Sequence, residues 1–139
     1  MSISDEAEAL VAGATEMAHL ATSVDDRPHV APVWYHYEDG HVYVFTGGRK
    51  LANVRRNPRV AVSIEASEDS DAQWTVTMQG TATVVEDEDR VLDWVRPVFG
   101  KYLGADVETW SDYHRESLEE GPDTTLLEIE VGSATHTTY

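Results

Sequence analysis

Half of the basic residues of this chain lie in a segment that contains no acidic residue. Five of the ten lysines and arginines fall within eleven positions: Arg49, Lys50, Arg55, Arg56 and Arg59. No Asp or Glu occurs between Asp39 and Glu65, although the chain holds 26 acidic residues. Arg49 and Lys50 directly follow the glycine pair Gly47-Gly48. A permissive glycine turn followed by paired bases is the local chemistry of an anion-binding site.

The elements predicted around this segment suit the same chemistry. Residues 41–46 predict a strand that ends at the glycine turn, and residues 51–54 predict a short helix. The N–H groups and the dipole of a helix N-terminus attract an anion, and the bases neutralise its charge. The alternative is that the bases, Arg55 and Arg56 above all, only balance acids elsewhere on the surface. The segment matches neither a Walker loop nor a dinucleotide-binding glycine fingerprint.

Length and composition predict one soluble domain. A chain of 139 residues supports a single core, so residues 1–139 are expected to form one domain. No apolar run approaches the roughly 20 residues that span a bilayer, and the N-terminal residues resemble no signal peptide. Cysteine is absent, which excludes disulfides, thiolate metal sites and a cysteine nucleophile. We therefore expect a cytoplasmic protein.

The net charge of −16 indicates adaptation to salt. Lys50 and Lys101 are the only lysines, so the chain is rich in acids and poor in lysine. Such a chain repels itself at low ionic strength, whereas in molar salt the Debye length falls to about 3 Å. We expect the cytoplasm of a high-salt organism. The negative charge argues against nucleic acids and anionic membranes as partners.

The order of predicted elements indicates a mainly β protein. Six strands are expected at residues 17–24, 28–37, 41–46, 59–65, 74–85 and 124–131, with an acidic loop at 66–72. A short N-terminal helix is expected at residues 5–16, with Ser4 as its N-cap. A helical insertion is expected at about 86–120, with one helix kinked or broken at Pro97 and another at 108–118. Consecutive strands with late helices indicate a mostly antiparallel barrel with helical decoration.

Several sequence blocks carry a family resemblance. The blocks are LAT (20–22), RPHVAPVWY (27–35), VFT (44–46), RKLANVRRNPRV (49–60) and QGTA (79–82). In order and spacing they resemble the pyridoxamine 5′-phosphate oxidase-like superfamily of FMN-binding split barrels. The later blocks KYLG (101–104), WSDY (110–113) and THTTY (135–139) resemble its branch of flavin/deazaflavin oxidoreductases.

The resemblance implies a fold, an assembly and a set of binding residues. The fold is a six-stranded antiparallel split β-barrel that forms a homodimer, with cofactor sites at the interface between the subunits. His29, Val30, Ala31, Pro32, Val33 and Trp34 are expected along the isoalloxazine ring, and Phe45 and Thr46 along the ribityl chain. Arg49, Lys50 and Asn53 are expected at the phosphate. Thr75 is expected to approach from the long strand of the partner subunit, and no catalytic residue is assigned.

The resemblance also implies an oxidoreductase that moves a hydride between its cofactor and a small organic substrate. The sequence lacks a basic residue at the end of the 29–34 block and the C-terminal motif with arginine and tryptophan. Oxidation of pyridoxamine phosphate is therefore not expected. FMN is favoured because it is the commoner cofactor of the superfamily, while the C-terminal blocks favour the deazaflavin coenzyme F420.

Other interpretations stay open at this point. One is a flavin or haem carrier or sensor without turnover, with His136 as the haem ligand; another is a structural dimer without cofactor. No metal site is expected, because the histidines lack compact ligand spacing. A hydrolase is not expected, since Ser63 and Ser67 lack a nucleophile elbow. His29, His36, Trp34 and Trp74 either face the cofactor or belong to the fold, and Trp94 is expected in the core.

Overall fold

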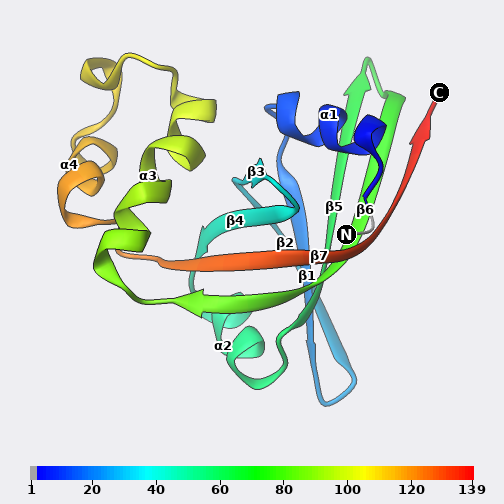
Figure 1. Ribbon diagram of the computed structural model, residues 1–139, viewed down its shortest axis with the longest axis horizontal. Helices are drawn as coiled ribbons and strands as arrows, with labels where there is room; N and C mark the ends of the chain where they lie inside the picture. The colour runs from blue at the N-terminus through cyan, green and yellow to red at the C-terminus, as the bar shows by residue number, and fades with distance from the viewer. Residues whose placement is uncertain (1–2) are drawn as a thin grey trace.

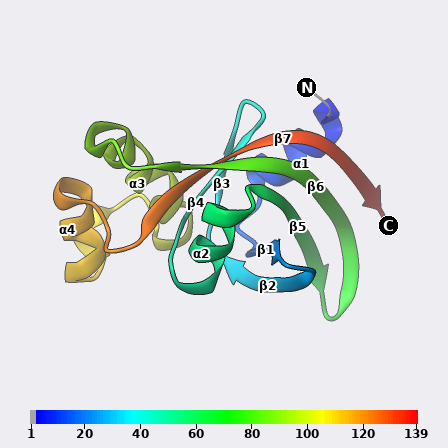
Figure 2. The same cartoon turned by 90° about the horizontal axis from the view of Figure 1, so that it is seen from below.

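The computed structural model describes residues 3–139, which form one curled sheet with four α-helices (Figure 1). Seven antiparallel strands follow the order β2-β1-β5-β6-β7-β4-β3. Their bounds are β1 (Ala18–Val24), β2 (Arg27–Val33), β3 (His36–Glu38), β4 (His41–Thr46), β5 (Arg59–Glu68), β6 (Asp71–Val85) and β7 (Thr125–Thr138). The sheet curls until β2, at one edge, contacts β4 near the other edge (Figure 2). The mainly β, antiparallel prediction is confirmed, but the predicted number of six strands is wrong.

The seventh strand arises because the predicted strand 28–37 is divided. β2 pairs with β1 and ends at Val33, whereas β3 begins at His36 and pairs with β4. Between them, the Tyr35 N–H donates to the Tyr102 hydroxyl at 3.1 Å, and the Tyr35 hydroxyl donates to the Val11 carbonyl at 2.6 Å. These tertiary bonds replace ladder bonds, so the chain crosses from one edge of the sheet to the other.

Two hairpins turn more tightly than the sequence indicated. β5 continues to Glu68 and β6 begins at Asp71, so the predicted loop at 66–72 shrinks to Asp69-Ser70. Both of these residues have positive φ, 51° and 72°, as a two-residue turn between twisted strands requires. Asp25-Asp26 does the same between β1 and β2, with φ of 52° and 61°. Short polar side chains tolerate this conformation better than others do.

The helices are α1 (Asp5–Gly13), α2 (Gly48–Arg56), α3 (Glu88–Leu103) and α4 (Asp112–Glu120), with a 3-10 turn at Val107–Thr109. Ser4 caps α1 as predicted, because its hydroxyl accepts the Ala7 N–H at 3.1 Å. α3 runs through Pro97 without a break, held by the buried Val95 and Val98 on either side. The predicted helix at 108–118 is divided, since Ser111 caps a separate α4.

Two hydrophobic cores support these elements. The main core fills the inside of the curled sheet with residues such as Leu20, Ile64 and Met78, and α1 closes it with Val11. The second core lies under α3 and α4, which stand together at one end of β6 and β7 (Figure 1). α3 and α4 thus cover the end of β4 that leads into the glycine turn.

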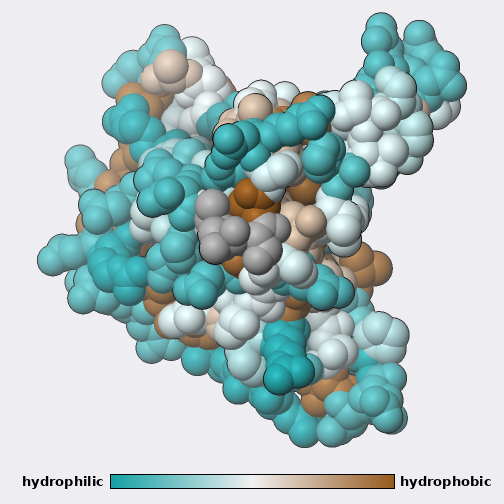
Figure 3. All heavy atoms as spheres, turned by 45° about the vertical axis from the view of Figure 1, so that its right-hand side comes forward, coloured by the Kyte–Doolittle hydropathy of each residue, from teal (hydrophilic) through white to brown (hydrophobic). Residues whose placement is uncertain are grey.

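The outer surface is largely hydrophilic, as the face in Figure 3 shows, with small hydrophobic patches between charged side chains. No helix within residues 3–139 combines the length and apolar character that crossing a membrane requires.

Candidate functional site

A basic cavity of about 440 Å³ lies between the β1–β2 hairpin and the start of α2. Its lining residues are Val24, Asp25, Arg27, Pro28, His29, Arg49, Asn53 and Arg56. Arg56 forms an ion pair with Asp25 at 3.2 Å. In the described part of the chain, no carboxylate pairs with Arg27 or Arg49. Two positive charges are therefore left to meet an anion from outside the chain.

No side chain caps the N-terminus of α2, which borders the basic cavity. The N-cap residue Gly47 offers no side chain to the first N–H groups, and the first turn contains no acidic residue. Gly48 has a φ of 61°, which a residue with a side chain adopts only with strain. The N–H groups of the first turn thus lack the side-chain acceptor that most helices supply, and they suit an anionic ligand.

Two asparagines fix α2 against the hairpin. Asn53 Nδ2 donates to Thr22 Oγ1 at 3.0 Å, and Asn57 Nδ2 donates to the Ser23 carbonyl at 3.0 Å. The Thr22 side chain is buried, so the first of these bonds is shielded from water. The asparagines therefore set the position of Arg49 relative to β2.

Two buried polar atoms, one in the lining of the basic cavity and one at the end of β4, have no hydrogen-bond partner within residues 3–139. They are His29 Nδ1, on β2, and Thr46 Oγ1, at the end of β4. A third such atom, Lys101 Nζ, lies 3.2 Å from the centroid of the Tyr35 ring, and burial lowers the pKa of Lys101 to about 8. The aromatic ring accounts for the lysine, but nothing comparable satisfies His29 and Thr46. Since an unpaired buried polar group costs about 1–3 kcal/mol, a partner from outside the chain is expected.

An aromatic cavity of about 210 Å³ lies where the chain leaves the C-terminal end of β2. It is lined by Trp34, Phe45, Val98, Phe99, Tyr113, His114 and Thr124. The Trp34 ring stacks on Tyr102 of α3, with centroids 4.8 Å apart and planes 8° apart. The helical insertion therefore holds Trp34 in place.

Two chain segments join the basic and aromatic cavities. Along β2, His29 lines the first and Trp34 lies just beyond the end of the strand at the second, roughly 16 Å apart at the rise of a strand. Along β4 and α2, Phe45 lines the aromatic cavity and Arg49 the basic one, with Thr46 buried between them. We call the residues along these two segments, from the basic cavity to the aromatic one, the path; it has a cationic end and an aromatic end.

The structure brings most of the residues selected from the sequence to this path. His29, Arg49 and Asn53 line the basic cavity, and Trp34 and Phe45 line the aromatic one. Between His29 and Trp34 lie Val30, Ala31, Pro32 and Val33; Val30 is 63% exposed, whereas Val33 is buried in the main core.

Two selected residues lie elsewhere. Lys50 is half-buried and lines neither cavity. Thr75, on β6, stands three strands from β2 in the sheet, roughly 14 Å at the usual strand spacing. Within one chain Thr75 therefore does not meet the other site residues.

Two residues that line these cavities, Arg27 and His114, were not selected from the sequence. Arg27 enters the basic cavity because the tight turn at Asp25-Asp26 folds it back toward α2. Its position next to the 29–34 block was the available signal. His114 enters the aromatic cavity from α4, and nothing in the sequence around it indicated this.

The other histidines and tryptophans belong to the fold. His136 Nε2 pairs with Glu6 at 3.2 Å, and His36 Nε2 with Glu38 at 3.3 Å. Trp74 packs on the main core, and Trp94 stacks on Tyr43 with centroids 3.7 Å apart. Arg55 pairs with Glu86 at 3.0 Å, as the surface interpretation expected. Within residues 3–139 no three His, Asp or Glu side chains gather to hold a metal ion.

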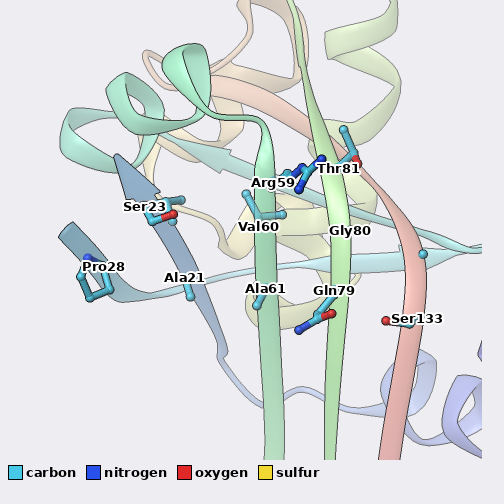
Figure 4. A pocket seen from close by; sticks show the side chains of 12 residues that line it. Ala21, Ser23, Pro28, Arg59, Val60, Ala61, Gln79, Gly80, Thr81 and Ser133 are labelled. Atoms are coloured by element: carbon cyan, nitrogen blue, oxygen red, sulfur yellow. The ribbon is translucent and has the colours of Figure 1, made fainter. Parts of the chain in front are cut away.

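The largest cavity, about 600 Å³, is a hollow on the face of the sheet that the sequence did not indicate (Figure 4). Small side chains such as Ala21, Ala61 and Ser133 form its floor, and Arg59 lies across β6 toward Thr81. Pro28 lines both this hollow and the basic cavity, so the two adjoin.

Comparison with known proteins identifies the family and the fold. The family model described as pyridoxamine 5′-phosphate oxidase matches residues 4–137. An uncharacterized protein of Rhizobium meliloti is 35% identical over 71 residues, which is 50% of this chain and 46% of that protein. The chain thus matches less than half the length of this curated relative.

Solved structures share the fold over nearly the whole chain. A conserved hypothetical protein of Mycobacterium tuberculosis has a TM-score of 0.79 at 22% identity, covering 99% of this chain and 86% of its own. A FAD-binding protein of Mesorhizobium loti has a TM-score of 0.69 at 22% identity, with coverages of 98% and 95%. An F420 reductase has a TM-score of 0.69 at 18% identity, with coverages of 96% and 98%.

Proposed function

The chain belongs to the pyridoxamine 5′-phosphate oxidase family, and from that premise we propose that it binds a flavin with a ribityl phosphate along the path from the basic to the aromatic cavity. The phosphate lies at Arg49, Arg27 and the N-terminus of α2. The ring system lies toward Trp34. An extended flavin mononucleotide has a length comparable with the path.

One observation carries this proposal: the unpaired polar atoms His29 Nδ1 and Thr46 Oγ1 are buried on the two segments that border the path. Without a bound ligand, the folded chain bears the free-energy cost of burying both polar atoms with no hydrogen bond to offset it. The ribityl hydroxyls of a flavin both donate and accept hydrogen bonds, so they suit a hydroxyl and an imidazole nitrogen equally well.

The free edge of β2 supports the placement of the ring. β2 pairs with β1 on one side only, so alternate N–H and C=O groups on its other side are unpaired in the sheet. A flavin ring presents hydrogen-bond donors and acceptors along its polar edge. Residues 29–34 are thus proposed to bind the ring through their backbone.

When bound, the flavin supplies hydride transfer, while the protein supplies binding, orientation and exclusion of water. No lysine or arginine lines the aromatic cavity, so a phosphorylated substrate finds no charge partner there. We therefore propose an oxidoreductase that acts on an uncharged small molecule, with FMN as cofactor and F420 as the alternative.

We further propose that a second copy of the chain covers the hollow on the face of the sheet. The floor of small side chains permits close approach, and the shared Pro28 makes the hollow continuous with the basic cavity. Thr75, remote within its own chain, then reaches the site of the partner. Sedimentation in high salt tests this proposal: a dimer is expected, and a monomer would refute it.

Titration with FMN and F420 in high salt tests the cofactor proposal. Arg49→Ala is expected to weaken binding about 10- to 100-fold, the value of a charged hydrogen bond. Arg55→Ala is the matched control, because Arg55 pairs with Glu86 outside the cavity. Lys50→Ala is expected to weaken binding less than Arg49→Ala. Unchanged affinity of Arg49→Ala for both cofactors would refute the site.

A measurement of cofactor turnover distinguishes an enzyme from a carrier. Steady oxidation of reduced cofactor in the presence of an uncharged acceptor is expected of the enzyme. Tight stoichiometric binding of flavin with no turnover of any acceptor would instead indicate a carrier or sensor.

A further inference from the structure

We infer that the aromatic cavity binds a small, uncharged, single-ring compound, and that His114 donates a hydrogen bond from Nε2 to an acceptor atom of that compound. This inference rests on the proposed function, since it places the compound beside the flavin ring. It adds a substrate class and a binding residue.

The size and lining of the cavity set the class of ligand. An apolar protein cavity of about 150 Å³ is known to admit benzene, so about 210 Å³ leaves room for one ring with a short substituent. Three of its walls are the rings of Trp34, Phe45 and Phe99, which favour a planar partner. No residue of the lining carries a permanent charge, so an ionic ligand would lose its hydration there without compensation.

Tyr113 is not free to bind the ligand. Its hydroxyl donates to Asp123 Oδ1 at 2.6 Å and accepts the Asp123 N–H at 3.1 Å. Burial, followed by the bond to the carboxylate, raises the pKa of Tyr113, so the phenol stays protonated. Within residues 3–139, the polar groups of the lining that then remain for a ligand are the His114 ring, the Trp34 indole N–H and the Thr124 hydroxyl.

Ser111 is the hydrogen-bond partner of His114 Nδ1. Ser111 Oγ accepts the His114 backbone N–H at 3.4 Å and lies 2.8 Å from His114 Nδ1. We assign the serine proton to Nδ1, so that Ser111 Oγ accepts the backbone N–H and donates to the ring. The ring proton then resides on Nε2, for which no partner exists within residues 3–139.

Aromatic rings hold the imidazole of His114 in place. His114 lies in the first turn of α4. The one carboxylate of that turn, Asp112, already pairs with Arg115 at 2.6 Å. The imidazole is held by Trp34, at a centroid distance of 5.8 Å, and by Phe99, edge-on at 4.9 Å. A fixed N–H donor within aromatic walls suits a carbonyl or a similar acceptor.

Three compounds of one shape test the inference: acetophenone, isopropylbenzene and benzoate, which carry an acceptor, no acceptor and a charge. Their dissociation constants are measured by ligand-observed NMR on the FMN-saturated protein. Wild type is expected to bind acetophenone about 10-fold more tightly than isopropylbenzene, the value of one hydrogen bond, and to bind benzoate more weakly than either.

His114→Phe is expected to abolish the preference for acetophenone while isopropylbenzene still binds, which also reports an intact cavity. His114→Gln, which restores an N–H donor, is expected to recover part of the preference, and His41→Phe, outside the cavity, to keep all of it. Binding of benzoate as tightly as acetophenone, or a preference that survives in His114→Phe, would overturn the inference.

FMN titration of the same samples separates the two claims. Normal FMN affinity with no ring compound bound refutes the aromatic site and leaves the flavin proposal standing. Ring compounds that bind with the expected preference to a protein that rejects FMN and F420 refute the flavin proposal alone.

Discussion

At the scale of the residue, the candidate site is marked by buried polar atoms without hydrogen-bond partners and by arginines without ion-pair partners. His29 and Thr46 leave buried polar atoms unpaired, and Arg27 and Arg49 have no ion-pair partner in residues 3–139. By contrast, Arg55 and Arg56 find carboxylates in Glu86 and Asp25. Among the arginines of the basic segment and the β1–β2 hairpin, Arg27 and Arg49 are the two that line the basic cavity without an ion pair.

Thr46→Val tests this reasoning, because it replaces the unpaired hydroxyl with a methyl group of the same shape. The flavin-free protein is expected to gain about 1–3 kcal/mol of unfolding free energy, while FMN binds more weakly. Thermal unfolding with and without FMN measures both effects. Thr22→Val, where the lost hydroxyl accepts from Asn53, is the control and is expected to destabilise. Loss of stability in flavin-free Thr46→Val would contradict the assignment.

Lys101 predicts a dependence of stability on pH. Its pKa is about 8 in the folded protein, against 10.5 for a lysine side chain free in water, so between these values the unfolded chain binds more protons. The unfolding free energy therefore rises with pH across this window. The destabilisation caused by burying the charged Lys101 ammonium is fully present below pH 8. The Tyr35 ring offsets part of that burden.

Lys101→Met is accordingly expected to be more stable than wild type at pH 7, with the difference shrinking as the pH rises to 10. Urea unfolding at pH 7, 8, 9 and 10 measures it. Burial raises the tyrosine pKa values in both proteins, so this contribution cancels in the difference. A difference that is constant over this range would contradict the prediction.

At the scale of the element, the position of the site depends on where strands end and bend. β2 ends at Val33 because Tyr35 bonds to Tyr102 and Val11, and β6 and β7 shift register between Gln79 and Gly80. A Cβ at Gly80 would lie 2.3 Å from the Glu130 carbonyl oxygen, so glycine is required there. The bend in the long strands also shapes the hollow that Gly80 lines.

Gly80→Ala is expected to cost about 2–3 kcal/mol of unfolding free energy, since backbone atoms must move to admit the methyl group. Urea unfolding measures this loss. Gly100→Ala is the comparison: its Cβ would lie 3.7 Å from Trp110 within α3, and alanine favours a helix. Equal stability of the two variants would contradict the close approach at Gly80.

At the scale of the whole molecule, charge is the dominant feature. The net charge of −16 is spread over a small surface, and the positive groups free to bind a ligand lie around cavities. The proposed phosphate site is thus a local positive region on a protein that repels anions at long range. Salt reduces the repulsion over the whole surface before it weakens contacts inside the cavity.

The melting temperature is therefore expected to rise between 0.1 M and 1 M KCl, as the Debye length falls from about 10 Å to about 3 Å. Thermal unfolding at several KCl concentrations measures the change. A melting temperature that stays constant or falls would show that self-repulsion does not limit stability.

The sequence by itself determined the fold class, the N-cap at Ser4 and the segment from Gly47 to Asn53, because alternation, capping and local charge are written in neighbouring residues. Tertiary structure alone decided the division of strand 28–37, the entry of Arg27 and the arrival of His114 from α4. Each of these depends on contacts between residues far apart in the chain, such as Tyr35 with Tyr102 and His114 with Trp34. The basic segment was thus predicted as an anion site from local chemistry, whereas the aromatic cavity exists only once α3 and α4 pack on the sheet.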